Sequence, residues 1–343
     1  MKNNLNILFL LCVIFNTLGQ DETTEKKFSI SGSIDAYFRT NLTGPNTAME
    51  DLDGGSYFLN PGTAFADRSG FSIGMANVIL GYEGEKVGFV ADLVFGPRGE
   101  AAVFLSSPST NIVNQLYAFW NVTDKVTLTL GNFNTFLGYE VISPTGNFNY
   151  STSYMFSYGP FSHTGFKADI AISEDFSLML GVMNSTDWTE INLDGSYTAG
   201  AQLGYKGQFL NLIYGDQTGT TGPTFQVDYT GGFDLTNSFY LGINSTYNDT
   251  DGSGFYGVAL YPQYAFSESF ALGLRGEYFN TFANASDDEN VIAVTLSGNY
   301  SIGGLKIIPE LRFDNWSQDY YLNSDSEPTS SLASFLVAAV FAF

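Results

Sequence analysis

The strongest constraint on the fold is an alternation of apolar and polar residues that begins at Phe28 and recurs to the end of the chain. In the stretch FSISGSIDAYFR, residues 28–39, one set of alternate positions is mostly apolar, whereas the other carries serine, aspartate, tyrosine and arginine. Successive side chains of a β-strand point to opposite faces, so this period of two predicts strands with one apolar and one polar face. The sequence therefore predicts an all-β protein.

Two kinds of interruption alternate along the chain. Short breaks such as EGEK (83–86), SED (173–175) and KG (206–207) are typical of hairpin turns, whereas the intervening breaks are generally longer and carry much of the acid. These breaks divide the chain into sixteen predicted strands, most of them nine residues or longer. The predicted strands span residues 28–40, 69–82, 87–97, 112–122, 126–136, 159–172, 176–187, 196–205, 208–215, 223–234, 239–247, 254–266, 270–280, 290–302, 305–316 and 331–343.

An even number of long strands, with short turns at one end and long loops at the other, predicts an antiparallel transmembrane β-barrel of the outer-membrane type. The alternative is a soluble β-sandwich, whose strands average about five or six residues. A sandwich must cover its apolar faces, and here nearly every predicted strand has one without obvious helices to cover it. A closed barrel satisfies its backbone hydrogen bonds internally in lipid, so we favour the barrel.

The first twenty residues, MKNNLNILFLLCVIFNTLGQ, have the composition of a secretory signal. Lys2 precedes an apolar run from Leu5 to Phe15, and this run is well short of the ~20 residues of a membrane-crossing helix. We expect residues 1–20 to be removed and residues 21–343 to form a single barrel domain. Cys12, the only cysteine, leaves with the signal, and Leu11 before it disfavours a lipoprotein.

Charge and composition exclude several classes of function. The chain has 35 acidic and 13 basic residues, and its net charge of −22 excludes a nucleic-acid partner. The only histidine, His163, adjoins Ser162, but neighbours on a strand point to opposite faces and cannot form a nucleophile–base pair. DTDGSG (249–254) begins like a calcium loop, yet Leu260 stands where the final glutamate belongs. We expect no enzyme activity, no metal site and no cofactor.

The segment GYEVISPTGNFNYSTSYMFSYGPFSHTGFK, residues 138–167, resembles a signature of the putative β-barrel porin-2 family of bacterial outer-membrane proteins. The matching elements are Gly-x-Glu-Val at 138–141, Asn-x-Asn-Tyr-Ser at 147–151 and Pro-Phe-x-His-Thr-Gly at 160–165. Thr152 departs from the basic residue expected in many relatives, which puts an anion contact there in doubt. The resemblance implies a pore for small solutes and leaves a homotrimer open. It also suggests that the third long loop, 137–158, folds inward.

Two groups of residues are candidates for lining such a pore. The first lies in loop 137–158, for which the alternative is an outward lid. The second consists of charges within strands, which alternation places on the inner face because a basic residue facing lipid costs about 2 to 4 kcal/mol. A ladder of salt bridges along the wall is the alternative role for these charges, and the two roles are compatible. The candidates are Glu140, Asn147, Asn149, Tyr150 and Tyr154 in the loop, and Asp35, Arg39, Asp228, Arg275, Glu277, Glu310, Arg312 and Asp314 in the strands.

The chain ends on SFLVAAVFAF, residues 334–343, which we interpret as the closing strand. Alternate residues from Phe335 to Phe343 share an apolar, lipid-facing side, and the opposite side is less polar than the other predicted inner faces. The terminal Phe343 resembles the signal that outer-membrane barrels present to the insertion machinery.

These features together predict an outer-membrane channel for passive diffusion of small hydrophilic solutes or ions, surrounded by lipid, with both termini periplasmic. The alternative is a barrel with a closed lumen that serves adhesion or envelope structure. Small and polar inner faces, such as Ser29, Ser31, Thr224 and Gln226, favour the open channel. The acidic net charge favours cations, whereas the arginines of the wall favour anions, so ion selectivity stays open.

Overall fold

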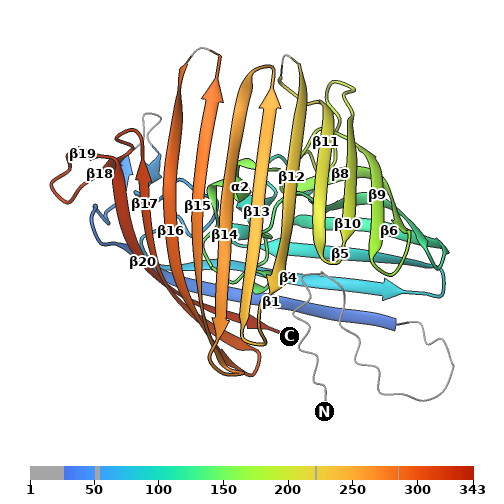
Figure 1. Cartoon of the computed structure of the whole chain (residues 1–343), viewed down its shortest axis with the longest axis horizontal. Helices are drawn as coiled ribbons and strands as arrows, with labels where there is room; N and C mark the ends of the chain where they lie inside the picture. The colour runs from blue at the N-terminus through green and yellow to red at the C-terminus, as the bar shows by residue number, and fades with distance from the viewer. Residues whose placement is uncertain (1–26, 51–54, 221, 285) are drawn as a thin grey trace.

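Sixteen long strands close into one barrel in the computed structural model, which describes residues 27–50, 55–220, 222–284 and 286–343 (Figure 1). The expected signal peptide, residues 1–20, lies outside the described residues. The predicted all-β barrel of sixteen strands is confirmed. The strands are β1 (Lys27–Asn41), β4 (Gly70–Glu83), β5 (Val87–Phe95), β6 (Val113–Thr123), β7 (Val126–Asn134), β8 (Ser162–Ala171), β9 (Phe176–Met183), β10 (Thr198–Tyr205), β11 (Gln208–Asp216), β12 (Pro223–Asp234), β13 (Phe239–Thr250), β14 (Ser253–Ala265), β15 (Phe270–Ala283), β16 (Ser286–Ile302), β17 (Leu305–Trp316) and β20 (Ser331–Ala342).

The barrel closes where the first strand pairs with the last. β1 runs antiparallel to β20, with Arg39 opposite Leu336, and β20 also pairs with β17. The pairing of β1 with β20 reaches Ser33 and Ala342, and directly after it Gly32 and Phe343 exchange two backbone hydrogen bonds of 3.1 Å. Each remaining barrel strand pairs with its neighbours along the chain. The closed ladder leaves no strand edge that would have to be satisfied in lipid.

The two faces of the wall differ as the alternation predicts, and β17 is a clear example. Leu311 and Phe313 point outward and are 49% and 47% exposed, whereas Glu310, Arg312 and Asp314 point inward and are 4% exposed or less. Apolar side chains on the outer face suit hydrocarbon, and the charges are kept on the inner face.

The strand ends differ from the prediction at a few places. β8 begins at Ser162 rather than 159, because Pro160 has no N–H to give to the ladder. β9 ends at Met183 rather than 187, and the chain then turns back so that Asp187 reaches the start of β8. At the long-loop end, two strands are longer than predicted. β15 ends at Ala283 rather than 280, and β16 begins at Ser286 rather than 290.

The long loops contain small elements that the alternation did not predict. They are α1 (Pro97–Ala102), the 3-10 turn η1 (Pro144–Gly146), α2 (Tyr154–Tyr158), the hairpin of β2 (Met49–Glu50) and β3 (Ser56–Tyr57), and the hairpin of β18 (Tyr321–Leu322) and β19 (Pro328–Thr329). In the described part of the chain, no helix has the length and apolar character needed to cross a bilayer.

Asp187 joins the loop after β9 to the beginning of β8. Its carboxylate accepts hydrogen bonds from the backbone N–H groups of Phe161 and Ser162, at 2.6 and 2.9 Å. Its backbone is left-handed, with φ of 68°, a conformation that aspartate and asparagine tolerate better than most residues. Burial raises the pKa of Asp187 to about 6.

We expect Asp187→Asn to raise the melting midpoint at pH 8 by a few degrees. A carboxyl pKa raised from 3.8 to about 6 means that the folded protein favours the protonated carboxyl. The stability that the protonated carboxyl contributes is fully present below pH 3.8 and is lost as the pH rises through 6. Asparagine keeps the acceptor oxygen and removes the charge, so the gain should vanish near pH 3.5. Asp187→Ala is the control and should lower the midpoint at both pH values. Thermal melts in detergent micelles, followed by circular dichroism, measure this, and a lower midpoint for the asparagine variant at pH 8 would contradict the expectation.

Candidate functional site

The segment that joins β7 to β8, residues 135–161, runs inside the barrel instead of forming an outer lid. We call it the inner segment; it contains η1 and α2, and α2 is visible behind β13 and β14 in Figure 1. Its side chains Tyr150 and Tyr154 are each 1% exposed. Tyr154 stacks on Phe279 of β15 and meets Trp316 of β17 edge-on, at centroid distances of 5.8 and 5.2 Å. The inner segment therefore fills part of the lumen.

Two glutamates of the barrel wall hold the inner segment by its backbone. Glu277 on β15 accepts hydrogen bonds from the N–H groups of Tyr154 and Met155, at 3.0 and 2.8 Å. Glu310 on β17 accepts from the N–H groups of Tyr150 and Ser151, at 3.0 and 3.3 Å. A carboxylate that accepts two backbone N–H groups makes strong, charge-assisted hydrogen bonds. These two wall charges therefore act as anchors for a loop.

Two wall aspartates complete the set of anchors. Asp228 on β12 accepts from the N–H of Gly138 at 2.8 Å and from the side-chain amides of Asn211 and Asn244 on the flanking strands. Asp35 on β1 accepts from the hydroxyl of Tyr150 at 2.5 Å and from the N–H of Met75. Carboxylates on four strands, β1, β12, β15 and β17, thus bind the inner segment from different sides of the barrel.

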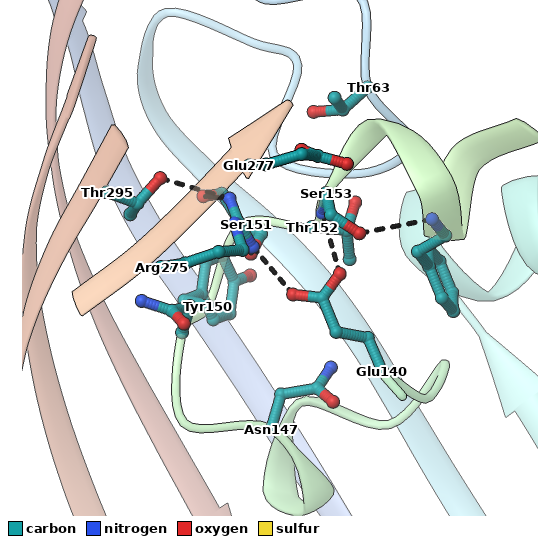
Figure 2. Close-up of polar contacts among 12 residues, drawn as sticks. Thr63, Glu140, Asn147, Tyr150, Ser151, Thr152, Ser153, Arg275, Glu277 and Thr295 are labelled. Carbon is teal, nitrogen blue, oxygen red and sulfur yellow. Dashed lines mark hydrogen bonds and ion pairs between the residues drawn. The ribbon is translucent and has the colours of Figure 1, made fainter. Parts of the chain in front are cut away.

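Glu140 of the inner segment forms a buried ion pair with Arg275 of β15 (Figure 2). The two atoms, Oε1 and Nη1, lie 2.6 Å apart, and the side chains are 3% and 0% exposed. Glu140 also accepts from the N–H of Ser153, while Arg275 donates to the carbonyl of Ser151 and the hydroxyl of Thr295. Arg275 therefore joins β15 to two places in the inner segment, Glu140 and Ser151.

Arg312 and Arg39 lie near each other on the same side of the barrel. Arg312 pairs with Asp314 on its own strand at 2.8 Å and donates to the carbonyl of Thr152. Arg39 donates to the carbonyl of Leu59 and to Asn41, at 3.1 and 2.7 Å. The candidate charges thus form two ion pairs, Glu140 with Arg275 and Arg312 with Asp314. A ladder of salt bridges does not describe the anchoring carboxylates, because their partners are mainly backbone N–H groups and neutral side chains.

The two candidate asparagines stabilise the inner segment in different ways. Asn147 closes a local loop by accepting from the N–H of Val141 at 2.9 Å and donating to its carbonyl at 2.7 Å. Asn149 reaches the wall and donates to the hydroxyl of Ser297 on β16 at 2.7 Å. Both are buried, so neither offers a free amide to a solute.

Glycines on the wall make room for the large side chains of the inner segment. A Cβ added at Gly242 of β13 would overlap the ring of Tyr139, and one at Gly273 of β15 would overlap the ring of Phe148. Tyr139 also stacks on Tyr261 of β14, with ring centroids 4.2 Å apart. The wall is therefore shaped to receive this segment, beyond the polar anchors.

The candidates taken from the sequence omit Arg98 and Asp92. Arg98 of α1 donates to the carbonyl groups of Ile142 and Tyr150 and lies over the ring of Phe65, 4.3 Å from its centroid. Asp92 on β5 accepts from Asn77 and Asn114 of the flanking strands. Asp92 is an acid in mid-strand within GFVADLVF, so the criterion applied to the other wall charges could have found it. Arg98 lies in a loop and gave no comparable signal.

The other side of the lumen contains a cavity of about 810 Å³. Residues of β6, β7, β8, β10, β11, β12 and β13 line it, together with Phe136 and Tyr139 of the inner segment. Lys206 and Gly207, in the turn between β10 and β11, also line the cavity, so it extends toward the short-turn end of the barrel. Among the described residues, no group of three or more His, Cys, Asp or Glu side chains is arranged to hold a metal ion.

Comparisons with known proteins agree with this architecture. The family model of putative β-barrel porin-2, OmpL-like, matches residues 27–343. No curated protein sequence matches the chain. Solved structures with a similar fold include OmpF of Salmonella typhi in complex with daunomycin (TM-score 0.63, 11% identity, 93% of this chain and 98% of that chain). They also include an anion-selective porin from Comamonas acidovorans (0.61, 10%, 93% and 100%) and a loop L8 deletion mutant of OmpT from Vibrio cholerae (0.60, 13%, 93% and 99%).

Proposed function

The chain belongs to the putative β-barrel porin-2 family, and we propose that this outer-membrane barrel is a water-filled channel through which small hydrophilic solutes diffuse passively. The observation that carries the proposal is the cavity of about 810 Å³ left beside the inner segment. Amide, hydroxyl and charged side chains contribute to its lining, as a hydrated path requires. The function includes no chemical step, so width, polarity and charge decide which solutes pass.

In this proposal the inner segment is the constriction of the channel. Most of the candidate residues act on solutes indirectly, because their polar groups are buried in contacts that fix the position of the segment. Glu277, Glu310 and Asp228 hold its backbone, and Arg275 with Glu140 joins it to β15. The side of the segment that faces the cavity, with Phe136 and Tyr139, then sets the width of the path.

The surroundings of the channel follow from the same proposal. Residues 1–20 direct export, residues 21–343 form the barrel, and lipid covers its apolar outer face. Because the number of strands is even, both termini lie on the same side of the membrane as the short turns. In outer-membrane barrels the short turns are periplasmic, so both termini are periplasmic in this proposal. The insertion machinery reads the terminal Phe343, and assembly as a homotrimer is compatible with the exposed outer wall.

Single-channel recording in planar bilayers tests the proposed function. We expect discrete conductance steps from the folded protein, and a reversal potential measured across a salt gradient gives its preference for anions or cations. Heat-modifiable migration on a gel confirms that the inserted protein is folded. Folded protein that gives no conductance would instead favour the alternative, a closed barrel with a role in adhesion or envelope structure.

A further inference from the structure

Three aromatic rings of the wall border the cavity, and the hydroxyl of one of them, Tyr240, accepts a hydrogen bond of 3.4 Å from Tyr139 of the inner segment. They belong to Phe119 of β6, Phe209 of β11 and Tyr240 of β13, and all three line the cavity of about 810 Å³. Each is only partly buried, so each ring has a free surface within the lumen. A general hydrated path does not need partly exposed aromatic rings, because apolar surface facing water is unfavourable.

Each of these rings lies across a glycine of the neighbouring strand. A Cβ added at Gly88 would overlap the ring of Phe119, and one at Gly232 would overlap the ring of Tyr240. Gly204 lies directly opposite Phe209, and a Cβ there would come within 3.0 Å of the ring. An aromatic side chain that covers a cross-strand glycine lies along the wall instead of standing out from it. The rings therefore form flat apolar platforms.

Groups that form hydrogen bonds surround the platforms. Thr127, Asn134 and Gln202 line the same cavity, and all three are only partly buried. Its charged residues are two lysines and two aspartates, Lys167, Lys206, Asp169 and Asp234, and the ammonium of Lys167 pairs with Asp169 at 2.6 Å. The lining is thus balanced in charge, in contrast to the net charge of −22 of the whole chain. A balanced lining does not favour an ionic solute of either sign.

From this arrangement we propose that the cavity is a binding subsite for neutral sugars, specifically for the ring form of a mono- or disaccharide. A pyranose ring presents C–H groups on its faces and hydroxyl groups around its edge. Its faces bury apolar area against the platforms of Phe119, Phe209 and Tyr240. The amides and hydroxyls of the lining bind the sugar hydroxyls, and the volume lies within the ~300–1,000 Å³ of small-molecule sites. The inference deepens the proposed channel function and rests on it.

Block of the channel current by cellobiose tests the proposal, with sorbitol as the matched probe because it has hydroxyl groups but no ring. We expect cellobiose to reduce the current in a saturable way and sorbitol to reduce it only at much higher concentration. Phe119→Leu and Phe209→Leu keep an apolar side chain but remove the platform, so each should raise the half-blocking concentration about five-fold. Phe166→Leu on the outer face of β8, where the ring is 46% exposed, is the control and should change nothing.

Two further results separate this proposal from the proposed channel. Conductance that cellobiose and sorbitol affect equally, or block that both platform variants leave unchanged, would overturn the sugar subsite and leave the channel intact. Isothermal titration of the detergent-solubilised protein with cellobiose gives an answer even without current. Binding of cellobiose without conductance would retain the subsite and reject the channel. No heat of binding in the titration, together with a current that cellobiose does not block, would reject the subsite.

Discussion

Replacing residues 136–160 with a short Gly-Asn-Gly turn is expected to raise the single-channel conductance by about two-fold or more. The inner segment occupies lumen between β1, β15 and β17 on one side and the cavity on the other, and current through a hydrated pore rises with its open width. The splice is feasible because Asn134 and Ser162 are register partners, and Thr135 donates a backbone hydrogen bond to Phe161. β7 and β8 can thus continue as a simple hairpin.

The deletion also releases the anchoring carboxylates, and this consequence can be measured separately. Glu277, Glu310 and Asp35 lose their partners in the segment and face water, which solvates the charges, and Arg275 loses Glu140 in the same deletion. Three carboxylates of the wall are thus released against one arginine. The selectivity should therefore shift toward cations as the conductance rises. A matched control deletes residues 191–195 in the loop between β9 and β10, of which Leu193 is 57% exposed, and should leave both quantities unchanged. A folded deletion variant with the original conductance would show that the inner segment does not obstruct the path.

The strands of the fold could be predicted because their signal is local. A period of two fixes which side of each strand faces lipid, so the inward direction of Glu310, Arg312 and Asp314 follows from Leu311 and Phe313 alone. The partners of the inward charges have no such signal. Glu277 binds Tyr154, which is 123 residues away in the chain, and Glu310 binds Tyr150 at a separation of 160. Only the closed barrel brings these groups together.

The last strand, β20, is a second example of a feature that the sequence alone could not explain. The inner side of β20 is less polar than expected for a wet wall, and the sequence offers no reason. In the structure, Leu336, Ala338 and Val340 are buried against Tyr150 of the inner segment and Tyr37 of β1. This part of the wall meets protein instead of water, because the inner segment covers it. The apolar inner face of β20 was thus a sign that protein covers it, and this sign could be interpreted only with the inner segment in place.

Breaking the ion pair between Glu140 and Arg275 is expected to cost about 3 to 5 kcal/mol of stability, because removal of one partner leaves a buried charge uncompensated. Arg275→Met fits the space of the side chain and deletes its bonds to Glu140, Ser151 and Thr295. Unfolding by guanidinium in detergent micelles, extrapolated linearly to zero denaturant, measures the loss. Lys167→Met is the control, because its pair with Asp169 is 22% and 43% exposed and should contribute less than about 1 kcal/mol.

The double variant Arg275→Met with Glu140→Gln distinguishes the charge from the packing. Glutamine keeps an oxygen that accepts from the N–H of Ser153 and removes the charge that the single variant leaves unpaired. The double variant should therefore be more stable than Arg275→Met alone, and the difference measures the free energy of burying the lone carboxylate. If Arg275→Met were no more destabilising than Lys167→Met, the pair would not hold the inner segment. The anchoring would then depend on Glu277, Glu310 and Asp228, whose partners in the inner segment are backbone N–H groups.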